Sequence, residues 1–223
     1  MPATASARFP RLLPLFAALT ALAGCATTRP MPYQGIQSSS YLRPNEQAHR
    51  GHQPYVYDTP VDWNRYRSFV MDPVDIYRGP DQQFEKVSDA DKQVLAGYMQ
   101  EQFQAKLRER YAQVVEPRSG TLRVHVTLTG ARASTRFIST FTKMDIGGAP
   151  YNTVQAVRGR EGLFTGSVSY AVEIYDASTQ KLLKAYVDKQ YPNAMNMKAT
   201  FGALSAARTG IQKGADNLLD NLQ

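Results

Sequence analysis

The chain has 223 residues, of which 43% are hydrophobic and 20% charged; this excludes a wholly disordered protein and allows one domain with a tail. Its single cysteine excludes an intrachain disulfide and a zinc site built from cysteines, and its three histidines are too few and scattered to suggest a histidine metal cluster. The net charge of +7 is a mild basicity, compatible with anionic lipid headgroups or a carboxylate-bearing cell wall.

The first 24 residues have the pattern of an export signal. Arg8 and Arg11 precede an apolar run, residues 12–23, which is shorter than the roughly 20 residues that a membrane-spanning helix needs. This run ends in Leu22-Ala23-Gly24-Cys25, which resembles the lipobox of bacterial lipoproteins: an aliphatic residue, two small residues and a cysteine.

The lipobox resemblance implies that residues 1–24 are a lipoprotein signal peptide, cut before Cys25. In that family the cysteine thiol receives a diacylglycerol and the new amine is acylated, so Cys25 would be the lipid anchor. Ala26 follows the cysteine where an aspartate would favour retention in the inner membrane. The resemblance therefore implies a protein on the periplasmic face of the outer membrane, a compartment in which a nucleic-acid partner is not expected.

Residues 25–60 are predicted to be the lipidated N-terminus and a flexible tether. The segment contains five prolines and the run Ser38-Ser39-Ser40, and no helical or strand period persists through it. Residues such as Tyr33 and Leu42 are unusually apolar for a pure linker, so we expect part of the segment to pack back on the domain. His49 and His52 fall in this tether, where we expect them to be solvated, because a metal site would need further ligands in a folded context. Residues 61–223 are then a single periplasmic domain.

The domain's elements follow from its periodicity. The clearest is a helix over residues 88–111, capped by Ser88 and carrying the buried stripe Leu95, Met99, Phe103, Leu107 and Tyr111. Strands are expected over residues 65–77, 122–129, 168–174 and 183–187, the last two forming a hairpin, and a final helix over residues 203–222. This order predicts an α+β fold, with one mixed or antiparallel sheet of about four strands and two helices packed on one face.

Several short motifs resemble a bacterial lipoprotein family catalogued as domain-of-unknown-function family 3313. They are Ser40-Tyr41-Leu42, Asp62-Trp63-Asn64-Arg65-Tyr66, Met71-Asp72-Pro73-Val74, Glu173-Ile174-Tyr175-Asp176-Ala177 and Val187-Asp188. Two departures stand out: members often carry glycine in the hairpin turn where this chain has Gln180, and the last helix lacks an expected tryptophan. The resemblance implies an outer-membrane lipoprotein but no known reaction.

Candidate catalytic groups are sparse, and no catalytic residue, metal ligand or cofactor is assigned. His125 lies on the face of its strand opposite the aliphatic residues, where we expect a surface or hydrogen-bonded histidine; no Gly-x-Ser-x-Gly elbow offers it a nucleophile. Asp72 and Asp75 flank Pro73 and are expected to be strand-end acids. A carboxylate pair for glycoside chemistry is the alternative.

The segment between the second strand and the hairpin, residues 130–165, combines arginines with aromatic residues. We predict that Arg136, Phe141 and Arg158 dock an envelope partner, because arginine and aromatic residues are enriched at interface hot spots. In the alternative, the second strand continues through Phe141 and residues 151–157 form another short strand. The loop then shortens to residues 144–150.

The sequence therefore favours a non-enzymatic binding or adaptor module, attached to the outer membrane through its lipid, with an envelope protein or the cell wall as its partner. Two alternatives stay open: a periplasmic hydrolase acting on wall or lipid, and a self-associating structural lipoprotein.

Overall fold

The computed structural model describes residues 30–48, 52–133, 166–192 and 204–223. Its centre is a sheet of nine strands, so the expected number of about four is wrong. The strands are β1 (Arg43–Pro44), β2 (Tyr55–Asp58), β3 (Ser68–Met71), β4 (Asp75–Ile76), β5 (Gln83–Glu85), β6 (Ala112–Gln113), β7 (Thr121–Arg132), β8 (Ser167–Asp176) and β9 (Leu182–Gln190). The helices are α1 (Asp89–Arg108) and α4 (Ser205–Leu218), with short 3₁₀ turns at Trp63–Arg65 and Asp220–Leu222.

The sheet is mixed, and its continuous order is β1-β2-β9-β8-β7-β3-β6. Strands β7, β8, β9, β2 and β1 pair antiparallel in succession. Along the other edge of β7, the segments β3, β4 and β5 pair parallel to it one after another. The single strand expected over residues 65–77 is thus divided, since Pro73 has no N–H to donate to a ladder.

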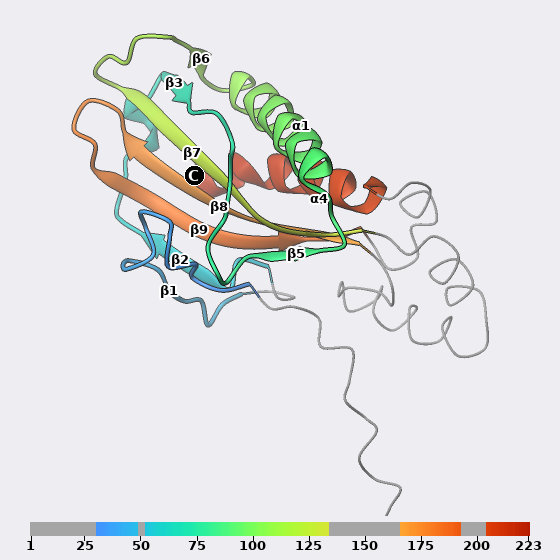
Figure 1. Ribbon diagram of the computed structural model, residues 1–223. Coiled ribbons are helices and arrows are strands. Elements are labelled where there is room, and N and C mark those ends of the chain that lie inside the picture. The colour runs from blue at the N-terminus through green and yellow to red at the C-terminus, as the bar shows by residue number, and fades with distance from the viewer. Residues whose placement is uncertain (1–29, 49–51, 134–165, 193–203) are drawn as a thin grey trace, which may run out of the picture.

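Two helices cover one face of the sheet (Figure 1). Helix α1 begins where the sequence predicts, because the Ser88 hydroxyl accepts a hydrogen bond from the Asp91 backbone N–H at 3.1 Å. Its predicted stripe is buried against the aliphatic side chains of β7 and β8. Neither helix is long and apolar enough to cross a membrane, a statement that covers only the described residues.

A segment from the expected tether covers the opposite face of the sheet. Tyr33, Ile36 and Leu42 are buried there against Ala185, Val187 and other small residues of β8 and β9. We call residues 33–42 the strap; it lies in blue beside β1 and β2, on the side of the sheet away from the helices (Figure 1). This confirms the prediction that part of the tether packs back on the domain. Strap residues run through irregular turns, so their burial has no regular sequence period.

Candidate functional site: a polar groove beside the strap

The alternation of β7 builds a polar surface on the strap side of the sheet. Leu122, Val124 and neighbouring aliphatic residues face the helices, so Arg123 and His125 face the other way. This confirms the prediction that His125 lies opposite the aliphatic residues of its strand. Asp72 and Asp75 reach the same surface because β3 and β4 run parallel to β7 at its edge.

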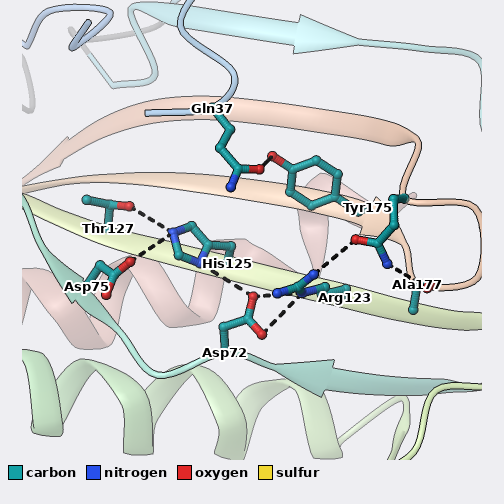
Figure 2. Close-up of polar contacts among 9 residues, drawn as sticks. Gln37, Asp72, Asp75, Arg123, His125, Thr127, Tyr175 and Ala177 are labelled. Atoms are coloured by element: carbon teal, nitrogen blue, oxygen red, sulfur yellow. Dashed lines mark hydrogen bonds and ion pairs between the residues drawn. The ribbon is translucent and has the colours of Figure 1, made fainter. Parts of the chain in front are cut away.

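The His125 ring lies between two carboxylates (Figure 2). Its Nδ1 is 3.5 Å from Asp72 Oδ2, and its Nε2 is 3.4 Å from Asp75 Oδ2. The side chain of Asp75 is 68% exposed, whereas that of His125 is 20% exposed. The imidazole ring is therefore mostly buried beneath this polar surface, whereas the Asp75 carboxylate is exposed and can contact a ligand.

Arg123 forms the second half of this arrangement. Its Nε is 2.9 Å from Asp72 Oδ2 and 3.2 Å from Asp72 Oδ1, and its Nη1 donates to Gln180 Oε1 at 3.0 Å. The guanidinium has five N–H donors, of which these contacts engage Nε and one on Nη1. The Arg123 side chain is 44% exposed, so its orientation is fixed while further donors face solvent.

Gln180 occupies a position in the hairpin turn that favours glycine. Its φ is +58°, in the left-handed region that residues with a Cβ adopt at a cost of about 1 kcal/mol. Its Nε2 donates to the Ala177 carbonyl at 2.7 Å, which leaves Oε1 directed to Arg123. The turn thus carries a glutamine that positions Arg123, although glycine would adopt this backbone conformation at a lower energetic cost.

Tyr175 and the strap complete the surface. The Tyr175 hydroxyl donates to Gln37 Oε1 at 3.1 Å (Figure 2). Burial raises the pKa of Tyr175, and the nearby Glu173 carboxylate raises it further, so the hydroxyl stays protonated and remains a donor. Gln37 therefore presents its amide N–H₂ outward from a fixed position.

These side chains line two hollows that meet. The first has a volume of about 400 Å³ and is lined by Gln37, Asp72, Pro73, Asp75, Arg123, His125, Tyr175 and Gln180. The second has about 390 Å³, shares Asp72, Pro73, Arg123 and Gln180 with the first, and continues along β3 to Val115 and Pro117. We call the two together the Arg123 groove; its shape suits an extended ligand that crosses Arg123.

The arrangement around His125 partly resembles a hydroxyl–histidine–carboxylate triad. Thr127 Oγ1 is 3.4 Å from His125 Nε2, while Asp72 lies at Nδ1. However, Thr127 is only 5% exposed, and Asp75 lies at the same Nε2 atom. A nucleophile must be accessible and within hydrogen-bond reach of its base, so this geometry favours binding over acyl transfer. Among the described residues, no group of three or more His, Cys, Asp or Glu side chains could hold a metal ion.

The structure brings some of the candidate residues from the sequence together and places others elsewhere. It brings Asp72, Asp75 and His125 together, whereas His52 lies elsewhere: its Nδ1 is 2.9 Å from the Lys189 carbonyl oxygen, so it is not a solvated tether residue. Sequence reasoning missed Arg123, whose alternation with His125 could have indicated it, and Gln37, which no periodic signal marks. The signal motif Leu22, Ala23 and Gly24, the anchor Cys25 and the docking residues Arg136, Phe141 and Arg158 lie outside the described residues.

Comparison with known proteins identifies a family. Residues 32–218 match the family described as "Protein of unknown function (DUF3313)". The chain belongs to this family. No curated protein matches it.

Two solved structures, both titled as PelC dodecamers from Paraburkholderia phytofirmans, show a distant likeness. The first, a point variant in space group C2, is 13% identical with a TM-score of 0.38, covering 75% of this chain and 94% of that one. The second, in space group P6, is 10% identical with a TM-score of 0.36, covering 67% and 86%. At these scores the likeness carries no argument about assembly or activity.

Proposed function

We propose that this family member is a non-enzymatic binding module of the bacterial cell envelope, lipid-anchored at Cys25 on the periplasmic face of the outer membrane. The Arg123 groove is its binding site. The observation that carries this proposal is a groove whose charged side chains contact one another, with no serine, threonine, cysteine or lysine among the described residues that line it.

The first test concerns the binding site and uses a photo-crosslinking amino acid introduced at Gln37 of the full chain, followed by illumination in cells. We expect one dominant crosslinked envelope component, which Arg123→Ala abolishes. The same amino acid introduced at Arg108, an exposed helix residue that contacts Gln104 and Gln113, is the matched control and should give no such product. Equal labelling from both positions would contradict the proposal.

The second test concerns the anchor. Cys25→Ser should abolish incorporation of labelled fatty acid, because only a thiol can form the thioether. Unchanged labelling would rule out Cys25 as the lipidated residue.

A hydrolase is the second candidate, favoured by the Thr127–His125–Asp72 order described above. A hydrolase that used Thr127 as its nucleophile would lose turnover in Thr127→Val, which keeps the shape of the side chain and removes the hydroxyl. A binding module should retain its crosslinked partner in that variant. The two outcomes separate the candidates, since Thr127 does not line the groove.

A further inference from the structure

The charge of the Arg123 groove restricts the ligands that it can take. The lining carries two carboxylate side chains, Asp72 and Asp75, against one guanidinium, Arg123. A phosphate or carboxylate ligand at Arg123 would also meet the carboxylates of Asp72 and Asp75, which disfavours anionic lipid headgroups. The small net charge equally offers no strong site for a polycation.

The lining instead offers both hydrogen-bond donors and hydrogen-bond acceptors. Asp75 offers exposed acceptor oxygens, Arg123 offers its remaining N–H donors, and Gln37 offers an amide N–H₂. A ligand that satisfies them needs adjacent groups that donate and accept at once, which is the property of neighbouring hydroxyls on a sugar ring. Pro73 and the Tyr175 ring add apolar surface for the C–H face of such a ring.

The strain at Gln180 supports a ligand-directed role for these side chains. A non-glycine residue at φ +58° is energetically costly, and a functional role for its side chain would account for that cost. The Gln180 side chain accepts a hydrogen bond from Arg123 and so fixes its position. The two hollows that meet at Arg123 and Gln180 accommodate more than one sugar unit.

We infer that the Arg123 groove binds a neutral polysaccharide chain, with Arg123 and Asp75 engaging neighbouring hydroxyls of one sugar. This inference rests on the proposed binding function and names its ligand class. The chemistry is shared by two sources: the N-acetylated glycan of the cell wall, and neutral polysaccharide that lacks N-acetyl groups.

The test titrates the purified domain, residues 26–223, with β-1,4-linked N-acetylglucosamine oligomers and separately with cello-oligosaccharides, by calorimetry and amide chemical shifts. We expect binding of at least one series, with shifts at the groove and tighter binding for longer oligomers. Preference for the first series identifies wall glycan as the source, and preference for the second identifies the other polysaccharide. Binding to neither series at millimolar concentration would overturn the inference.

Two variants decide whether the groove is the site. Arg123→Ala should weaken binding at least ten-fold, whereas Arg108→Ala should leave it unchanged. Gln180→Gly should weaken binding about three-fold or more while the melting temperature stays the same or rises, because glycine relieves the strain at this turn. If Gln180 had only a structural role, the affinity and the melting temperature would change in the same direction. Full affinity in both Arg123→Ala and Gln180→Gly would overturn the inference. If the Gln37 crosslink identifies a protein in cells while no saccharide binds, the binding module stands and the polysaccharide ligand is wrong.

Discussion

Glu173 is a carboxylate held under the strap with only one of its oxygens paired within the described part of the chain. It is 1% exposed, and its Oε1 accepts a hydrogen bond from the Ser38 backbone N–H. Its Oε2 and the Ser38 hydroxyl are both buried without a hydrogen-bond partner among the described residues. A buried polar side chain with an unpaired oxygen is costly, so this contact holds the strap at the expense of stability.

We therefore predict that Glu173→Gln raises the free energy of unfolding at pH 7 by about 1 kcal/mol. Glutamine keeps an acceptor for the Ser38 N–H and replaces the buried carboxylate with a neutral amide. Urea denaturation measures the change. Glu173→Ala is the control and should destabilise the protein, because it removes the acceptor as well. A stability loss in the glutamine variant would mean that the charge itself is needed.

Asp176 gives the protein an acid-sensitive contact at the start of the hairpin turn. Burial opposes its ionisation, but hydrogen bonds from the Ser178 hydroxyl, the Thr179 backbone N–H and the Tyr66 hydroxyl outweigh burial and lower its pKa to about 2. A pKa depressed in the folded state stabilises the protein above the unfolded value near 4. That contribution is lost as the pH falls from about 4 to about 2.

We predict that Asp176→Asn reduces stability by roughly 1–2 kcal/mol at pH 7, after allowance for solvent exposure, and makes little difference at pH 2. The free energy of unfolding, measured by urea titration at each pH, should converge for the two proteins in acid. Parallel curves over the whole range would exclude Asp176 as the titrating group.

At the scale of the elements, the sequence predicts the helices and strands whose buried residues recur at a regular spacing. Helix α1 has a cap at Ser88 and a stripe through Phe103, and both are found where expected. The same holds for the alternation in β7. The short strands β1 and β4 carry only two residues each, too few for any period to emerge, and they form because a long neighbour offers its edge.

The candidate site was harder to predict because it depends on which strands pair, and no local period reveals that pairing. Asp72 and His125 are 53 positions apart, and only the parallel pairing of β3 with β7 brings them together. Their residue types were visible in the sequence, but their proximity depends on register. The sequence marked Gln180 only through the glycine that the family resemblance implied at this turn, and it did not indicate the contact with Arg123.

Two helical glycines differ in surroundings and give a matched prediction. A Cβ on Gly214 of α4 would lie 2.1 Å from the Tyr170 hydroxyl oxygen, which donates to buried Asp188 at 3.0 Å. A Cβ on Gly97 of α1 would meet none of the described residues within 4 Å. Gly214→Ala should cost about 2 kcal/mol through overpacking, whereas Gly97→Ala should stabilise the protein by about 0.5–1 kcal/mol. Thermal and urea unfolding of both variants check this, and a neutral Gly214→Ala would mean that α4 can move away from the sheet.

At the scale of the whole molecule, the sheet is enclosed between two unlike layers. The helices α1 and α4 cover one face, and the strap covers part of the other (Figure 1). The strap also supplies Gln37 to the Arg123 groove. Cys25 precedes the strap by eight residues, so the proposed anchor would lie close in sequence to the wall of the binding site.

The strap's contribution can be measured by truncation, which gives the last prediction. A chain of residues 30–223 keeps every described residue, so its free energy of unfolding should equal that of residues 26–223. A chain of residues 61–223 loses the strap, β1 and β2, which uncovers Ala185 and Val187 and leaves β9 paired on one edge only, with β8. Burial of Tyr33, Ile36 and Leu42 contributes about 1.5–3 kcal/mol for each side chain, and their sum approaches the 5–15 kcal/mol that typically stabilises a domain.

The shorter chain should therefore lose at least about 4 kcal/mol, or fail to unfold cooperatively, when followed by circular dichroism in urea. The strap is fixed by apolar contacts and by the Ser38–Glu173 hydrogen bond, so a synthetic peptide of residues 30–60 added in excess should restore part of the loss. A scrambled peptide of the same composition is the control. A cooperative transition of unchanged midpoint in residues 61–223 would show that the sheet is stable without this layer, and the segment would then be the tether that its proline and serine content predicts.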